Sequence, residues 1–231
     1  MRIAVLVGSR RGATVGHGGF DTLAELDRHC PGDEVVMLHA DDDLAPAAGA
    51  VAGFGGPNPD RVRALLAAAP GLRWYHTLSA GVDRLLIPEV SGNAGLVLTN
   101  NSGAYDLAIA EHVLATIFAA AKRLPASFAA QGRHDWHADP GSTDVRGATL
   151  VILGMGSIGG ELAGLARGLG MRIIGVRRSG GDGCVTPDRL GEVAAEADYL
   201  AVCAPLTEAT RGIVDAAVIA RLRPTAWIIN I

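Results

Sequence analysis

Cysteine is scarce in this chain, with three residues, Cys30, Cys184 and Cys203, in 231. They are widely spaced, odd in number and contain no Cys-x-x-Cys pair, which excludes a disulfide framework and fits a reducing compartment. No uninterrupted apolar stretch reaches the ~18 residues that a membrane span needs. The first apolar run, Ile3–Val7, is typical of a strand and not of a signal peptide. We therefore expect a soluble, cytoplasmic protein without a membrane partner.

Aromatic residues and an excess of positive charge are also lacking. Aromatics make up 4% of the chain, and 24 acidic against 20 basic residues give a formal charge of −4. Without a basic stripe, nucleic acid is not expected as a partner. His134 and His137, with Asp135 and Asp139, lie in a polar stretch without a second ligand cluster, so no metal site is expected.

Small apolar residues dominate instead, and their pattern alternates between strand-like and helix-like segments. With 49% hydrophobic and 19% charged residues, the chain can bury a real core. Short apolar runs separated by helices predict an α/β fold with parallel sheets covered on both faces. We expect two domains, residues 1–100 and 101–231. The strands expected in the first are Ile3–Val7, Glu34–Leu38, Ala50–Phe54, Arg73–Thr77 and Leu96–Thr99; those in the second are Thr149–Leu153, Arg172–Val176, Tyr199–Cys203 and Ala226–Asn230.

Helices and loops are predicted between these strands. A long helix is expected over Tyr105–Arg123, followed by a loop over Gln131–Thr143, and a shorter helix over Phe20–His29. The early glycines between Gly8 and Gly19 lack the Gly-Lys-Ser/Thr of a phosphate loop, so they predict a flexible connection.

A glycine-rich turn follows the expected strand Thr149–Leu153. It contains Gly154, Met155, Gly156, Ser157, Ile158 and Gly159 and opens an expected helix over Ser157–Leu169. This Gly-x-Gly-x-x-Gly pattern allows a tight turn, a close approach of backbone to a pyrophosphate, and close helix–strand packing. In this context it predicts a dinucleotide site; the alternative is an incidental glycine turn.

The end of the next expected strand bears on which nicotinamide dinucleotide is bound. An acidic residue there would favour the ribose 2′-hydroxyl of NAD, but this chain has Arg177, Arg178 and Ser179. Two guanidiniums and a hydroxyl suit a 2′-phosphate, so NADP(H) is favoured and NAD(H) remains possible. The alternative is that both arginines are solvated surface charges.

Together with flanking segments, these motifs resemble the D-isomer-specific 2-hydroxyacid dehydrogenase family, and within it the glyoxylate/hydroxypyruvate reductases. The resemblance runs from about Trp74 to Ile231. Besides the glycine turn, the segments that carry it are Leu78–Asp83, Ala108–Leu114, Cys203–Thr207 with Thr210, and Ile228–Ile231. It implies a flavodoxin-like N-terminal substrate domain and a Rossmann NAD(P)-binding domain.

The resemblance also implies roles for particular residues. Ser79, Ala80, Gly81 and Val82 resemble the loop whose backbone N–H groups hold the substrate carboxylate; without the resemblance the loop could equally be an ordinary turn. Cys203, Ala204, Pro205 and Thr210 resemble the loop along the nicotinamide half of the cofactor. We interpret Cys203 as a small apolar residue rather than a nucleophile. Glu111 and His112 are adjacent on their helix and are expected to be structural.

In that family the catalytic arginine, acidic residue and histidine come after the position of Ile231, so none is assigned here. We expect a C-terminally truncated chain whose second sheet has four strands, with the last one at an exposed edge. The implied function is hydride transfer between nicotinamide and a small 2-oxo or 2-hydroxy acid, in a homodimer to which the Tyr105–Arg123 helix contributes. The alternative is a non-catalytic nucleotide-binding module or an inactive fragment.

Overall fold

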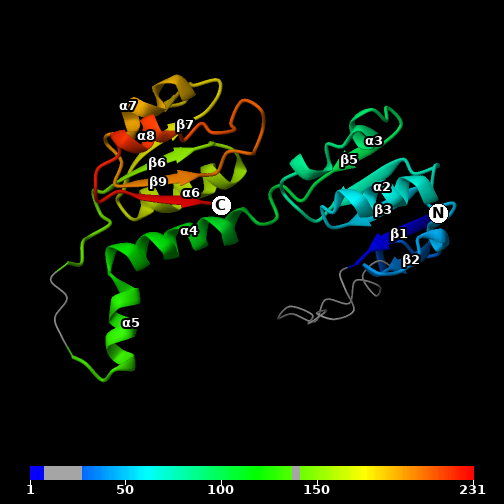
Figure 1. Ribbon diagram of the computed structural model, residues 1–231, viewed down its shortest axis with the longest axis horizontal. Coiled ribbons are helices and arrows are strands. Elements are labelled where there is room, and N and C mark those ends of the chain that lie inside the picture. The colour runs from blue at the N-terminus through cyan, green and yellow to red at the C-terminus, as the bar shows by residue number, and fades with distance from the viewer. Residues whose placement is uncertain (8–27, 137–140) are drawn as a thin grey trace. The chain divides into compact units, whose positions relative to one another are not determined.

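The computed structural model describes residues 1–7, 28–136 and 141–231 of the chain (Figure 1). The chain forms two compact units, Met1–Ser102 and Gly103–Ile231. Two expectations concern segments that lie almost entirely outside the described residues: the helix over Phe20–His29 and the connection from Gly8 to Gly19. Element labels follow Figure 1.

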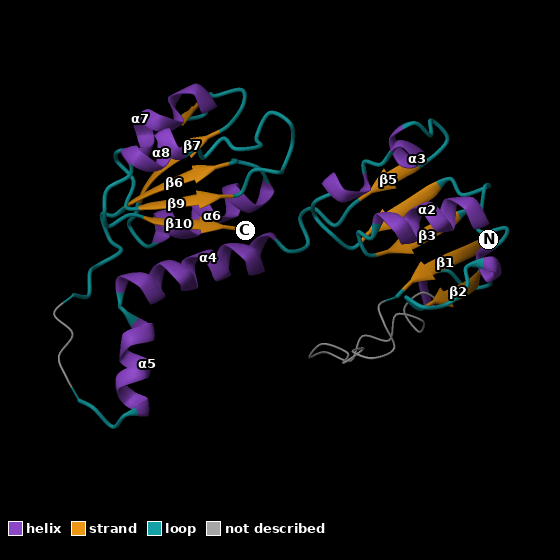
Figure 2. Ribbon diagram, in the orientation of Figure 1, coloured by secondary structure: helices purple, strands orange, loops and turns teal. Residues whose placement is uncertain are grey.

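Five parallel strands form the sheet of the first unit, in the order β2-β1-β3-β4-β5 (Figure 2). This is the flavodoxin-like order. All five expected strands are confirmed with small shifts at their ends. The strands are β1 (Arg2–Leu6), β2 (Glu34–Leu38), β3 (Ala52–Gly55), β4 (Trp74–Thr77) and β5 (Val97–Thr99).

Short helices pack against this sheet and close its larger core. They are η1 (Ala45–Ala47), α2 (Pro59–Ala68), η2 (Asp83–Leu85) and α3 (Pro88–Ser91). Helix α2 begins where the Asn58 side chain accepts hydrogen bonds from the backbone N–H groups of Asp60 and Arg61, at 3.1 and 3.2 Å. Such a cap contributes about 1 kcal/mol. It orients the helix so that Val62 and Leu65 are fully buried in the cluster that contains Tyr75.

The sheet of the second unit also has five parallel strands, in the order β10-β9-β6-β7-β8. They are β6 (Thr149–Leu153), β7 (Arg172–Val176), β8 (Cys184–Val185), β9 (Tyr199–Val202) and β10 (Trp227–Asn230). The four expected strands are confirmed, and β10 lies at the edge as expected. The expected count of four is wrong because β8, two residues long, is too short to give a strand-like pattern.

Helices cover both faces of this second sheet. They are α4 (Asp106–Ala121), α6 (Ser157–Gly168), η3 (Pro187–Arg189), α7 (Leu190–Ala194) and α8 (Ala216–Arg221), while α5 (Leu124–Gly132) extends away from the sheet (Figure 2). One buried cluster joins α4 and α6 to one face, through residues such as Val113, Ile117 and Leu162. A second cluster joins α7 to the other face through Leu190 and Val193. The α/β architecture with parallel sheets is therefore confirmed.

The helix and loop expected between the two sheets need correction. Helix α4 ends at Ala121, two residues before the expected end. A separate helix α5 follows it and extends over the first two residues of the expected loop. The break is at Arg123, whose left-handed φ of 53° turns the chain, and Pro125 then sits in the first turn of α5. Proline is tolerated there because its missing N–H would have no helical partner.

Of the helices in the described residues, none alone is long and apolar enough to cross a membrane. Helices α4 and α5 meet that test only as a pair, and they bend by 66° at their junction.

Candidate functional site

The turn after β6 is closed by Gly154, which has a left-handed φ of +99°. Its N–H donates to the carbonyl oxygen of Val176 on β7, at 2.9 Å. A Cβ added at this position would lie 2.5 Å from the backbone nitrogen of Ala204. Both the backbone conformation and the contact with the loop after β9 therefore require glycine.

The other two glycines of the turn have different surroundings. A Cβ on Gly159 would lie 2.1 Å from the carbonyl oxygen of Gly154, so glycine lets the first turn of α6 pack onto the strand end. A Cβ on Gly156 would meet nothing within 4 Å. Backbone at Gly156 is thus open to an approaching group, while Gly154 and Gly159 are tightly packed.

Helix α6 begins at Ser157, with Gly156 as its N-cap and no side-chain cap supplied by the described residues. Its positive dipole end lies directly behind the open backbone of Gly156, and that arrangement suits a phosphate group. The Met155 side chain packs against β7, since a Cβ added to Gly175 of β7 would lie 2.8 Å from the Cγ of Met155. The residues of the turn therefore fit the pyrophosphate of a dinucleotide, as the sequence pattern predicts.

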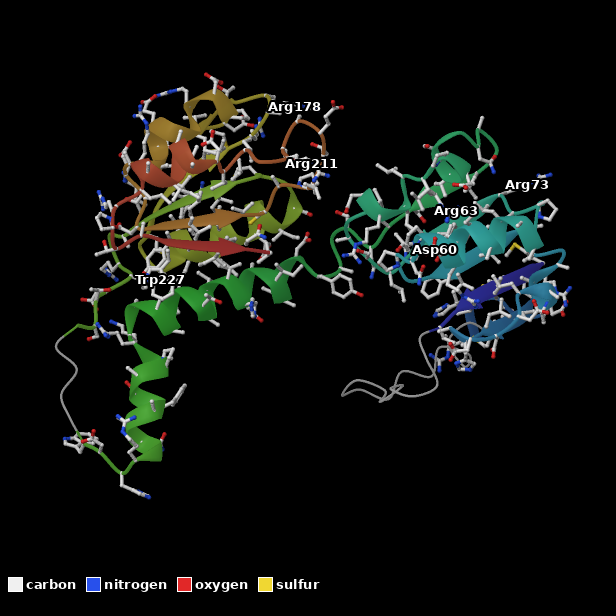
Figure 3. The ribbon with its side chains drawn as sticks, in the orientation of Figure 1. Asp60, Arg63, Arg73, Arg178, Arg211 and Trp227 are labelled. Atoms are coloured by element: carbon white, nitrogen blue, oxygen red, sulfur yellow. The ribbon has the colours of Figure 1, made fainter. Side chains whose placement is uncertain are left out.

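The three residues expected to recognise a 2′-phosphate have different environments. The guanidinium of Arg177 donates from Nε to the carbonyl oxygen of Gly180 at 2.6 Å, and from Nη2 to the Asp182 carboxylate at 2.8 Å. Arg178 and Ser179 are exposed, and Figure 3 shows Arg178 on the rim of its unit beyond β7. The Arg177 guanidinium is therefore hydrogen-bonded within its own loop, whereas Arg178 and Ser179 are exposed.

The loop after β9 lies against the glycine turn, as the contact between Ala204 and Gly154 shows. The N–H of Cys203 donates to the carbonyl oxygen of Leu153 at 2.8 Å, which continues the β6–β9 pairing. The Thr210 hydroxyl donates to the carbonyl oxygen of Pro205 at 2.5 Å and accepts from the N–H of Thr207 at 2.8 Å. Its hydrogen bonds hold the loop in shape.

Burial raises the pKa of the Cys203 thiol to about 11. A thiol with such a pKa is almost wholly protonated at neutral pH, and the thiolate is the nucleophilic form. This environment agrees with the interpretation of Cys203 as a small apolar side chain at the strand end.

In the first unit, the loop Ser79–Val82 follows β4 and is tied to the end of β5. The Asn100 side-chain N–H donates to the carbonyl oxygen of Ala80 at 2.6 Å, and the Asn101 N–H donates to that of Ser79 at 3.1 Å. Gly81 has no left-handed φ, so its role in the loop does not depend on an unusual backbone conformation.

A cavity of about 480 Å³ adjoins this loop, lined by Val82, Leu98, Thr99 and Asn100. Sequence reasoning missed Asn100 as a candidate. A signal was available, because Asn100 directly follows a strand, and the carboxyl ends of parallel strands meet at the edge where α/β proteins bind ligands.

The remaining candidates lie on α4 and in the polar stretch after α5. Glu111 and His112 are exposed on α4, and the His112 carbonyl oxygen accepts from Thr116. No group of three or more His, Cys, Asp or Glu side chains in the described part of the chain is placed to hold a metal ion. His137 and Asp139 lie outside that part.

Residues 114–231 match the family described as D-isomer specific 2-hydroxyacid dehydrogenase, NAD binding domain. This match covers half of the chain and includes the glycine turn. The chain belongs to this family. Among its members, the chain is 30% identical over 226 residues to glyoxylate/hydroxypyruvate reductase B of Pectobacterium atrosepticum, covering 91% of the chain and 68% of that protein.

Other members of the dehydrogenase family are similar over different lengths. D-3-phosphoglycerate dehydrogenase of Synechocystis is 30% identical over 173 residues, which is 72% of the chain but only 31% of that longer enzyme. Among solved structures, a family protein from Aeromonas salmonicida has a TM-score of 0.81 at 27% identity, with 99% of the chain and 72% of that protein covered. The resemblance inferred from the sequence is confirmed at the level of the family.

Proposed function

We propose that the protein is an NAD(P)H-dependent oxidoreductase that transfers hydride between nicotinamide and a small 2-oxo or 2-hydroxy acid, of the glyoxylate or hydroxypyruvate kind. The observation that carries the proposal is the turn after β6. Gly154 and Gly159 are packed so tightly that no side chain fits, while Gly156 leaves open backbone at the N-terminus of α6. The cofactor, when bound, supplies the hydride.

The chain's own proposed contributions are binding and orientation. The turn Gly154–Gly159 would hold the pyrophosphate, and the loop Cys203–Pro205, braced by Thr210, would lie along the nicotinamide half. In the first unit, backbone N–H groups of Ser79–Val82 would hold the substrate carboxylate. The neighbouring cavity of about 480 Å³ is large enough for a small acid.

NADP(H) is the cofactor that we favour over NAD(H). Residues 177–179 contain no acidic residue that would repel a 2′-phosphate, and Arg178 offers an exposed guanidinium at the end of β7. Charge-assisted bonds from arginine to phosphate are among the stronger polar contacts in proteins.

A non-catalytic nucleotide-binding module is the second candidate. It is favoured by the cavity beside Ser79–Val82, which is lined by Val82, Leu98, Thr99 and Asn100 without an ionisable side chain from the described residues. Such a lining can bind an acid but offers no general acid or base.

One pair of measurements separates these candidates. NADPH oxidation is followed by absorbance with glyoxylate, hydroxypyruvate, pyruvate and 3-phosphohydroxypyruvate, and thermal stability is followed with each cofactor alone. Ligand at a hundred times its Kd should stabilise the protein by about 2.7 kcal/mol. Turnover is measured on a chain extended past Ile231, where the family resemblance places the catalytic residues. Stabilisation with turnover then supports the oxidoreductase, and stabilisation without turnover on any acid supports the binding module. If the protein showed neither stabilisation by a cofactor nor turnover, both candidate functions would be contradicted.

We further propose that the protein forms a homodimer through its second unit. Exposed apolar side chains support this, since Leu107 on α4 is 52% exposed and Phe128 on α5 is 65% exposed. Burying such exposed apolar surface against a second chain would be favourable. Light scattering should give twice the mass of the chain at micromolar concentration; a monomer throughout would refute the proposal.

A further inference from the structure

The connection between β7 and β8 is unusually short. Strand β7 ends at Val176 and β8 begins at Cys184, so residues 177–183 join two strands that pair in parallel. Parallel neighbours ordinarily need a connection of a dozen or more residues. We call residues 177–183 the β7–β8 crossover.

The crossover reverses twice within this length because four successive residues adopt left-handed backbone angles. Their φ values are 57° at Gly180, 76° at Gly181, 50° at Asp182 and 77° at Gly183. Glycine adopts these angles readily, and aspartate is one of the few other residues that tolerates them. Because glycines also leave an isolated segment free to take many other conformations, this shape needs contacts that select it.

Arg177 supplies such contacts from the first position of the crossover. Its backbone N–H donates to the carbonyl oxygen of Val185 at 3.0 Å, and its carbonyl oxygen accepts from the N–H of Gly180 at 3.1 Å. Its side chain reaches across the crossover to the Gly180 carbonyl oxygen at 2.6 Å and the Asp182 carboxylate at 2.8 Å. Backbone and guanidinium of Arg177 together hold the first and third residues of the left-handed segment, and the backbone also bonds to β8 just beyond it.

The same contacts alter what Arg177 can offer to an anion. Its positive charge is opposed by Asp182, and its Nε and one Nη donate within the crossover. Arg178 and Ser179 come next in the chain and are exposed. Their direction depends on the backbone that Arg177 holds.

We infer that Arg177 is a positioning residue for cofactor discrimination: its bonds to Gly180 and Asp182 fix the β7–β8 crossover so that Arg178 and Ser179 can receive a 2′-phosphate. Arg177 does not itself bind that phosphate. The inference rests on the proposed preference for NADP(H) and assigns different roles to two adjacent arginines.

Asp182→Asn tests the inference because the two possible roles of Arg177 predict opposite changes in NADPH affinity. If Arg177 bound the phosphate directly, removing the competing and repelling carboxylate would tighten NADPH binding. If Arg177 positions the crossover, losing its ionic partner loosens Arg178 and Ser179 and weakens NADPH binding. Because the ion pair is exposed, we expect a weakening of about three- to fivefold, with NADH binding changed less than twofold. Dissociation constants are measured by nicotinamide fluorescence.

Arg177→Lys gives a second, independent comparison. Lysine keeps the charge but not the planar fork that reaches two acceptors, so a positioning role predicts a loss of NADPH affinity as large as in Arg177→Ala. A direct phosphate contact predicts that lysine retains most of the affinity. The matched control is Asp188→Asn on η3, which removes one carboxylate outside the crossover and should change NADPH affinity less than twofold.

Thermal unfolding of each variant, measured without ligand, confirms that it is folded. Unchanged or tighter NADPH binding by Asp182→Asn, or full rescue by Arg177→Lys, would overturn the inference. If the unaltered protein bound neither cofactor, or did not prefer NADPH, the proposed function would fail first, and the two failures are thus distinguishable.

Discussion

At the scale of single residues, the glycines of the turn after β6 differ in what they tolerate. Gly154 combines a left-handed φ with a backbone neighbour 2.5 Å from any added Cβ, whereas Gly156 has open space. The pattern Gly-x-Gly-x-x-Gly could be read from the sequence, and so could its place between strand and helix. The contact of Gly154 with Ala204, fifty positions later, could not, because it depends on how β9 pairs with β6.

Gly154→Ala is expected to destabilise the protein by about 3 kcal/mol, since a left-handed conformation and a backbone clash both oppose a Cβ. The free energy of unfolding is measured with urea. The matched control is Gly168→Ala in the last turn of α6, where a Cβ meets nothing within 4 Å. It should leave stability unchanged or raise it by up to about 1 kcal/mol. Equal effects of the two substitutions would contradict this account of the turn.

Cys203 is expected to react slowly with alkylating reagents. With its pKa raised to about 11 by burial, about one molecule in a thousand carries the thiolate at pH 8. Peptide mass spectrometry after iodoacetamide should show alkylation about two orders of magnitude slower than that of a simple thiol. The rate should rise as the pH is raised towards 11. Ordinary reactivity at pH 8 would show that the thiol is not buried as described.

At the scale of elements, predictions from the sequence held where apolar runs were four or five residues long. Such runs bury enough side chain to be strands in any parallel sheet, and all nine expected strands are present. Strand β8 was missed because its two residues leave no pattern, and no helix was expected at α5, whose first turn contains Pro125. The hydrogen bonds from Arg177 to Gly180 and Asp182 could not be predicted for another reason. Nothing in the order of residues shows that Gly180–Gly183 turn left-handed and return a carbonyl oxygen to the guanidinium.

Among the described strands, β10 forms one edge of its sheet and pairs with β9 (Figure 3, where Trp227 is labelled). Trp227 and Ile228 are 52% and 41% exposed, so the part of this edge that the structure describes presents apolar side chains. Such an edge favours association between chains.

Ile228→Lys is therefore expected to reduce concentration-dependent association while changing the free energy of unfolding by no more than about 0.5 kcal/mol. Light scattering over a range of concentrations and urea unfolding provide the two measurements. As a contrast, Ile229→Ala at the buried neighbour should cost about 2–4 kcal/mol. Association unaffected by the lysine would show that this edge does not drive it.

At the scale of the whole molecule, each of the two parallel sheets carries candidate site residues at the carboxyl ends of its strands. In one unit, Asn100 ties the loop Ser79–Val82 to the end of β5 beside a cavity. In the other, the glycine turn, the β7–β8 crossover and the loop after β9 follow neighbouring strands. The fold class, the family and the glycine turn were predictable because they depend on local patterns. The different roles that we propose for Arg177 and Arg178 were not predictable, because both arginines were expected to contact a 2′-phosphate.

The central claim is that this second edge binds a nicotinamide dinucleotide and prefers the one with a 2′-phosphate. Calorimetric titration of the protein with NADPH and with NADH tests it most directly, with Arg178→Ala measured alongside. We expect NADPH to bind at least about tenfold more tightly than NADH, since a charge-assisted hydrogen bond contributes about 1.5–3 kcal/mol. Arg178→Ala should abolish that preference and leave NADH affinity unchanged. Failure to bind either dinucleotide, tighter binding of NADH, or a preference that survives Arg178→Ala would contradict the claim.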